Sequence, residues 1–238
     1  MSRTAKTEAL ASHLLDGFLL LREKYAFLEP MLFDRRVIDV RGSGTSARGF
    51  HSLKHTLFLS CAQDIANLAL DADRRAPSIL NVLAALQDGP IRNELRERFA
   101  MWKMPKPASY SDPFIIEALA RIEQREEAQR RAQFDELLHE LQSSWATLSG
   151  STTIERFRQI RDKVSAHMEI RQVADTYAPI DIATIGLKWG DILQTINPMQ
   201  RLVELCGLLV RNATFAWDSL ESQLAASSAG FWNVGNIG

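Results

Sequence analysis

The feature that most constrains this chain is the spacing of its apolar side chains, which recur every three or four residues along most of its length. The first segment shows the pattern at Leu10, Leu14, Phe18 and Leu21. This spacing places apolar side chains on one face of an α-helix, whereas a half-buried strand requires strict alternation. Strand signals are scarce in the sequence. The chain is therefore predicted to be all-α, a helical bundle with short connections.

Breaks in the apolar pattern divide the chain into helices and connectors. Proline, glycine and small polar residues mark these breaks, because they end helices or favour turns. Helices are expected over residues 10–28, 53–70, 77–87, 91–102, 113–148 and 182–224, the last interrupted at Asn197 and Pro198. A further helix is expected to begin at Thr152 and to run through residues 160–167. A flexible arginine- and glycine-rich loop is expected over 34–49, a linker over 103–112, and a flexible tail over 225–238.

Length and composition indicate one domain over residues 1–238. A chain of 238 residues with 46% hydrophobic residues is long enough to bury roughly 70–75% of its unfolded surface. Its formal net charge is −1, so no global cationic field would hold nucleic acid. Any contact with RNA must therefore be local.

The two cysteines, Cys61 and Cys206, lie in apolar helical patterns, where a buried free thiol is the common outcome. A disulfide framework is not indicated. The N-terminal residues form no recognisable signal peptide, and no run of 18 apolar residues is present. These observations predict a soluble cytoplasmic protein with no membrane contact.

The segment near residue 160 carries the strongest functional clue. Thr152 and Glu155 have the spacing of a capping box, which predicts where this helix begins. On a regular helix counted from Ile160, Arg161 and His167 fall on the two edges of an apolar stripe, about 9 Å apart along the axis. Polar groups at the edge of a buried seam need partners. They are either ordinary core-edge residues with satisfied hydrogen bonds or parts of a binding site.

The segment Ile160-Arg161-Asp162-Lys163-Val164-Ser165-Ala166-His167 resembles the Arg-x4–6-His motif of the HEPN superfamily, including the polar residue after the arginine. Further similarity lies in the apolar stretches 60–71, 78–80 and 83–86, which resemble the abortive-infection (Abi) branch of HEPN-like proteins. The similarity covers most of residues 10–225. It implies a HEPN-like helical bundle, and a metal-independent endoribonuclease in which a homodimer brings two motifs together.

The residue chemistry agrees with what the resemblance implies. Histidine titrates near neutral pH, so His167 is assigned as the acid and base that exchanges protons with RNA. Arginine presents a planar, permanently charged fork that matches two phosphate oxygens, so Arg161 is assigned as the phosphate clamp. Asp162 is expected on the outer face, where it would orient a neighbour or pair with a cation across the dimer. Neither a cofactor nor a metal is required by these roles.

Other cations could contact the RNA backbone. Near the motif these are Lys163, Arg156 and Arg171; in the expected loop they are Arg35, Arg36, Arg41 and Arg48. Glycines beside arginines allow a loop to follow a phosphate backbone. The alternative for each is an ordinary surface charge or a structural ion pair. The glycines at 42 and 44 complete no nucleotide-binding fingerprint, which excludes a nucleotide fold.

Two alternatives to a ribonuclease remain at this point. His51 and His55 have the i, i+4 spacing that can share a zinc ion, but no acidic residue of the metalloprotease motif lies between them, so a chance pair is favoured. The second alternative is a non-catalytic helical dimer that acts as a protein-interaction module, with an antitoxin protein as its partner in a toxin–antitoxin system.

Overall fold

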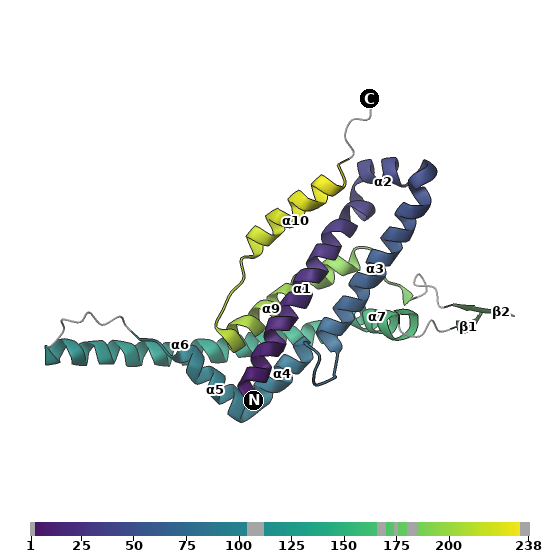
Figure 1. The fold of residues 1–238 in the computed structure, drawn as a ribbon. Helices are drawn as coiled ribbons and strands as arrows, with labels where there is room; N and C mark the ends of the chain where they lie inside the picture. Colours follow the sequence, from purple (N-terminus) through teal and green to yellow (C-terminus); the bar gives the residue numbers. More distant parts are fainter. Residues whose placement is uncertain (1–2, 104–111, 166–169, 174–175, 180–184, 234–238) are drawn as a thin grey trace.

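The computed structural model describes residues 3–103, 112–165, 170–173, 176–179 and 185–233. The described chain is a helical bundle (Figure 1), so the predicted fold class is confirmed. Its α-helices are α1 (Arg3–Phe33), α2 (Arg35–Arg41), α3 (Ala47–Leu70), α4 (Ile79–Gln87), α5 (Gly89–Ala100), α6 (Pro113–Ser149), α7 (Thr152–Ile160), α9 (Asp191–Arg211) and α10 (Trp217–Phe231). The described chain also contains two short turns, the 3-10 turn η1 (Gly44–Ser46) and the π turn η2 (Arg161–Ser165).

Helix α1 is the centre of the bundle. It packs mainly against α3 on one side and α9 on the other (Figure 1). The residues that the sequence pattern placed on its apolar face, Leu14, Phe18, Leu21 and Leu28, are fully buried. Because burial of a large apolar side chain contributes about 1.5–3 kcal/mol, this seam stabilises the packing of the three helices.

A short hairpin interrupts the helical chain after the motif. Strand β1 (Ile170–Val173) pairs antiparallel with β2 (Thr176–Pro179), with Ile170 opposite Pro179 and Val173 opposite Thr176. The hairpin was not predicted from the sequence, because four residues per strand are too few to show alternation. Figure 1 shows the hairpin projecting beyond α7, away from the bundle.

The prediction of a flexible loop over 34–49 was wrong for most of that segment. Asp34 caps α2 by accepting a hydrogen bond from the Arg36 N–H at 2.9 Å. Val37 then buries its side chain against Met31 and Phe50. The glycines that suggested a loop serve only a short turn. Gly44 has a φ of 63° in the turn before α3, and a residue with a side chain rarely adopts this conformation.

Two prolines expected to end helices do not end them. Helix α1 continues through Pro30 to Phe33, and α9 continues through Pro198 to Arg211. A proline removes one ladder donor, but buried neighbours such as Met31 and Met199 hold both helices in place. The break in the predicted 182–224 helix comes instead after Arg211, at Asn212, which has a left-handed φ of 51°. Asparagine tolerates this conformation at a helix end.

The expected flexible tail is helical through Phe231. Helix α10 lies along α1 and is fixed to it by two bonds to main-chain oxygens. The Ser228 hydroxyl donates to the Ala26 carbonyl at 2.6 Å, and the Trp232 indole N–H donates to the Phe27 carbonyl at 3.0 Å. Within the Ser- and Ala-rich segment that suggested disorder, Ser228 is the buried residue of α10. Residues 104–111 of the predicted linker and 234–238 of the predicted tail lie outside the described residues.

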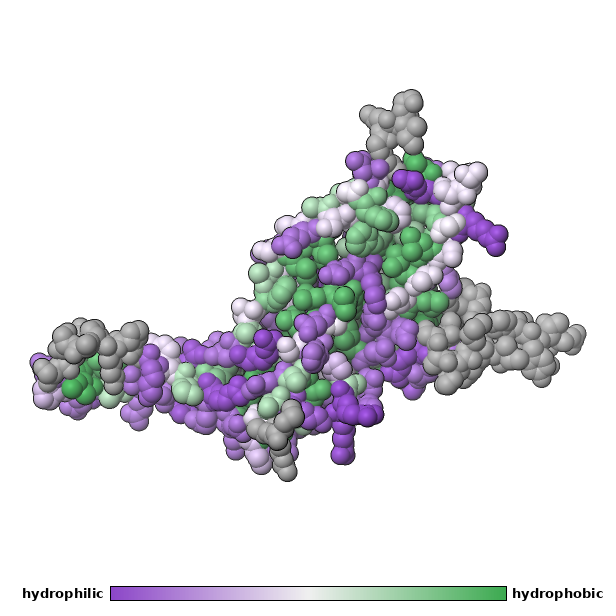
Figure 2. Space-filling view, viewed as in Figure 1, coloured by the Kyte–Doolittle hydropathy of each residue, from purple (hydrophilic) through white to green (hydrophobic). Residues whose placement is uncertain are grey.

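Helix α6 is much longer than its neighbours. Asp112 caps it and Pro113 begins it, as the sequence predicted. Its C-terminal half contributes Phe134, Leu138 and Leu141 to the core, while its N-terminal half extends past the bundle (Figure 1). The projecting part is largely hydrophilic, whereas the bundle around α1 and α10 shows more hydrophobic surface (Figure 2).

An ion pair joins α6 to α9. The Arg201 guanidinium donates to both carboxylate oxygens of Glu140, at 2.7 and 2.9 Å, and this hydrogen bonding holds the pKa of Glu140 below its usual range. A carboxyl whose pKa is lowered by folding stabilises the fold above its unfolded pKa, and this contribution is lost as the pH falls through the folded pKa.

We expect Glu140→Gln to lower the free energy of unfolding at pH 7 by about 0.5–1 kcal/mol, a small value because both side chains are well exposed. Urea denaturation should show the difference from wild type shrinking as the pH falls below the usual glutamate pKa. The matched control is Glu136→Gln, at an exposed site of the same helix. A deficit that persists in acid would show that the charge of Glu140 is not the cause.

Cys61 and Cys206 are buried free thiols, as expected from their apolar settings. Burial raises the pKa of each to about 12, so neither thiolate forms near neutral pH. Among the described residues no helix is both long and apolar enough to cross a membrane.

Candidate functional site

The motif is carried by α7, a short helix that packs on α3. The Ser151 hydroxyl accepts a hydrogen bond from the Ile154 N–H at 3.2 Å and caps the helix. The predicted capping box is not formed: the cap is Ser151, one residue before Thr152, and Glu155 binds Arg158. Ile154, Phe157 and Ile160 are buried, and they fix the orientation of α7 against the core.

The helix does not continue regularly through the motif. Regular α-helix ends at Ile160, and Arg161 begins the π turn η2. The expected regular helix is interrupted by this turn over Arg161–Ser165, because a π turn closes its hydrogen bonds over five residues instead of four. Single π turns are frequent at functional sites, where they redirect side chains.

Arg161 lies at the edge of the buried seam, with 24% of its side chain exposed. Its Nε donates to the Asp162 Oδ1 at 2.7 Å. The other carboxylate oxygen of Asp162 lies 3.8 Å from Arg158, which in turn binds Glu155 with two bonds of 2.7 and 2.8 Å. Charges therefore alternate along one side of α7 and η2, and the bonds from Arg158 lower the pKa of Glu155.

This arrangement leaves part of the Arg161 fork available. Only the Nε–H is bound by a described side chain, so the outer N–H groups have no hydrogen-bond partner in the described part of the chain. A guanidinium held by a neighbouring carboxylate is pre-oriented, which reduces the entropy lost when it binds phosphate. His167 lies outside the described residues, as do residues 166–169 as a whole.

The other three cations predicted near the motif lie on three different elements. Arg156 donates to the Gly186 carbonyl at 3.1 Å and so joins α7 to the segment before α9. Lys163 is exposed on η2. Arg171 belongs to strand β1, and its side chain lies outside the described part of the structure.

The four arginines of the expected loop do not join the motif. Arg35, Arg41 and Arg48 are exposed, and Arg36 binds the carboxylate of Asp34. Figure 1 shows α2 and the first turns of α3 at one end of the bundle, with α7 further along α3. The basic residues therefore form two separate groups, one on α2 and the start of α3 and the other on α7, η2 and β1.

The histidine pair on α3 has no described metal partner. His51 and His55 are exposed, and the His51 ring packs edge-on against Phe50. Within the described ranges, no three His, Cys, Asp or Glu side chains are placed to share an ion.

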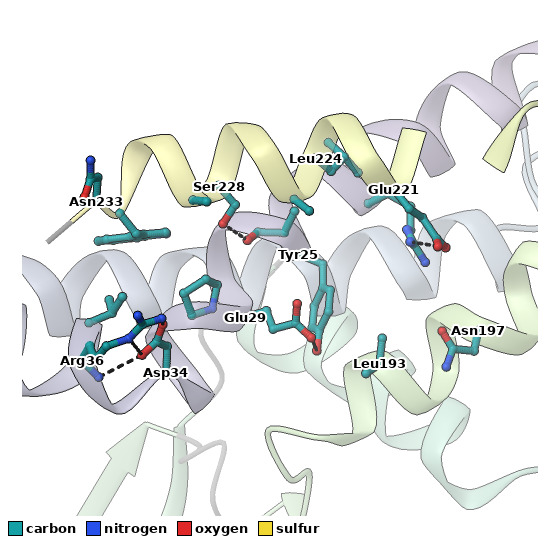
Figure 3. Close-up of a pocket in the computed structure, with 17 residues that line it drawn as sticks. Tyr25, Glu29, Asp34, Arg36, Leu193, Asn197, Glu221, Leu224, Ser228 and Asn233 are labelled. Carbon is teal, nitrogen blue, oxygen red and sulfur yellow. Dashed lines mark hydrogen bonds and ion pairs between the residues drawn. The ribbon is translucent and has the colours of Figure 1, made fainter. Parts of the chain in front are cut away.

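A large pocket that the sequence analysis did not find lies between α1, α2, α9 and α10 (Figure 3). Its volume is about 730 Å³. Its charged groups pair with each other: Arg22 binds Glu221 at 3.0 Å, and Arg36 binds Asp34. Burial raises the pKa of Tyr25, whose hydroxyl donates to Glu29. The pocket brings together segments expected to be loop and tail, so no local sequence signal could have revealed it.

The chain folds as a helical bundle, and Arg161 lies at the edge of a buried seam, six residues before His167. These are the features on which the resemblance to HEPN domains rested. The family model HEPN_AbiU2, described as AbiU2, matches residues 4–230. The chain belongs to this family, the HEPN domain of abortive-infection AbiU2 proteins, which are antiphage proteins. No curated protein and no solved structure matches the chain.

Proposed function

We propose that this protein is a metal-independent endoribonuclease of an antiphage or toxin–antitoxin system. The observation that carries the proposal is the Arg161 guanidinium, held by Asp162 at the edge of the buried seam with its outer N–H groups available. Family membership supports it, because the Arg161 and His167 pattern stands within the matched residues 4–230. RNA is the proposed substrate, and the cytoplasm is the proposed location.

In this proposal His167 takes the proton from a ribose 2′-hydroxyl, and the 2′-oxygen attacks the adjacent phosphorus. The bond to the 5′-oxygen breaks, and this leaving group takes up a proton, so that a cyclic phosphate and a 5′-hydroxyl result. Arg161 stabilises the charge that develops on the phosphate oxygens. One histidine per motif cannot serve as base and acid at the same moment. We therefore propose a homodimer in which the second motif supplies the other group.

The test is digestion of single-stranded RNA by purified protein with EDTA present. Wild type should cleave, and His167→Ala should lower the rate by about 10²–10⁴, the usual contribution of one acid–base group. The matched control, His139→Ala, replaces an exposed histidine on α6 and should cleave like wild type. Circular dichroism should show all three proteins folded. Undiminished cleavage by a folded His167→Ala protein would refute this mechanism.

A second function, a non-catalytic helical dimer or antitoxin-binding module, is favoured by one observation. The projecting end of α6 exposes apolar side chains, with Phe114 78% exposed and Ile116 and Ile122 also exposed. Exposed apolar residues on an arm are typical of protein-interaction surfaces. Absence of RNase activity in wild type, together with a stable complex with a co-expressed antitoxin, would establish this function instead.

A further inference from the structure

The end of the bundle that holds α2 and the first turns of α3 is locally cationic. Residues 34–55 contain five arginine or lysine residues and two aspartates, in a chain whose net charge is −1. Asp34 is already bound by Arg36. Arg35, Arg41 and Arg48 are exposed, and within the described part of the chain none has an acidic partner at ion-pair distance. Asp39 is the remaining acid, so positive charge prevails here.

An aromatic pocket of about 360 Å³ opens at this end, between α2, α3 and α10. Phe50 and Trp232 form its buried wall, with their rings 6.1 Å apart and nearly perpendicular. Phe231, 60% exposed, stands at its rim. The lining residues are Arg41, Ser46, Gly49, Phe50, Leu53, Phe231 and Trp232. Aromatic walls next to a free arginine are suited to a flat ring that carries a phosphate.

A row of cations and rings leads from this pocket along α3 toward the motif. The Lys54 Nζ lies 5.9 Å from the Phe50 ring and 5.4 Å from the Trp189 ring. Trp189 is 43% exposed and packs edge-on against Phe58. The segment that carries Trp189 is bound through Gly186 to Arg156 of α7. From residue 50 to residue 58 the helix rises about 12 Å, so the row spans a few nucleotides only.

We propose that this row is a binding track for single-stranded RNA, which places one unpaired base in the Phe50–Trp232 pocket and leads the strand toward Arg161. Arg41 binds the phosphate next to that base, and the exposed face of Trp189 stacks on a base closer to the motif. The track rests on the proposed function for the identity of its ligand. Only an unpaired strand fits, because the bases of a duplex are stacked on one another and cannot enter a pocket.

The track is tested by binding, not by cleavage. The probe is a fluorescent 2′-O-methyl single strand of roughly 12 nucleotides, within the range of known single-strand sites. It cannot be cut, because the attacking hydroxyl is blocked. Fluorescence anisotropy measures its Kd for wild type and for Trp189→Ala, Arg41→Ala and Gly49→Leu. The last variant fills the pocket, since a Cβ at Gly49 meets no atom within 4 Å.

We expect Trp189→Ala and Gly49→Leu each to raise Kd about tenfold, the effect of losing one stacked base. Arg41→Ala should raise Kd and reduce the salt dependence of binding by about one counterion. The matched controls are Phe114→Ala, which removes an exposed ring on α6, and Arg125→Ala, which removes an exposed cation there. Both controls should bind like wild type.

Three results would overturn the track: no binding of the probe by wild type, equal Kd values in the track and control variants, or tighter binding of a duplex of the same sequence. The proposed function fails separately, if His167→Ala still cleaves RNA. If the track variants bind the probe more weakly but the wild-type protein does not cleave RNA, the binding track is supported and the nuclease function is refuted.

Discussion

Arg161→Ala is expected to slow RNA cleavage by about 10²–10³, the cost of removing one preorganised donor from a developing negative charge. The fold should survive, because the side chain is at the edge of the core and its described hydrogen bond is to the adjacent Asp162. Arg161→Lys should restore only part of the rate, since a lysine keeps the charge but lacks the planar fork. Initial rates on a defined single-stranded RNA measure these effects.

The matched control is Arg158→Ala, one turn earlier on the same side of α7. Arg158 binds Glu155 and is about half exposed, so its removal should leave the cleavage rate within a few-fold of wild type. Equal losses in the Arg158→Ala and Arg161→Ala variants would mean that general positive charge supports cleavage, and that Arg161 has no particular role at the phosphate.

Phe157→Ala is expected to have the largest effect on stability. The side chain is fully buried where α7 meets the core, and truncation of a buried phenylalanine costs about 3–5 kcal/mol through lost burial and the cavity left behind. Urea denaturation followed by circular dichroism measures the change. Phe114→Ala, at an exposed position of α6, should change the free energy of unfolding by less than about 0.5 kcal/mol.

A small loss in the Phe157→Ala variant would show that α7 can detach from α3 without unfolding the bundle. In that case the motif would sit on an independently mobile element, and the geometry of Arg161 would not be fixed by the core. The expected large loss instead ties the orientation of the motif to global stability.

Much of the helical architecture could be predicted from local pattern. The apolar period located α1, α3, α4, α5 and α6, and the aspartate–proline pair at 112–113 located the start of α6. The errors came where tertiary packing overrides local signals. Pro30 and Pro198 remain within helices because both helices are held by the core, and α10 is ordered by bonds to main-chain oxygens of α1. Such contacts between distant parts of the chain leave no local trace.

The candidate site was predictable only in part. The apolar stripe of α7 correctly indicated that Arg161 borders the buried face. The π turn could not be read from the sequence, because a shift from four-residue to five-residue bonding depends on how η2 meets α3. The Phe50–Trp232 pocket was also hidden, since it joins side chains from opposite ends of the chain.

The length of α6 affects how the proposed dimer has to be measured. Its 37 residues reach about 55 Å at 1.5 Å per residue, whereas a compact chain of this size would have a radius of gyration of about 18 Å. The protruding rod increases hydrodynamic drag, so a single 26.8 kDa chain should elute early from a sizing column and imitate a larger particle. Mass from light scattering, not elution volume, therefore distinguishes one chain from two.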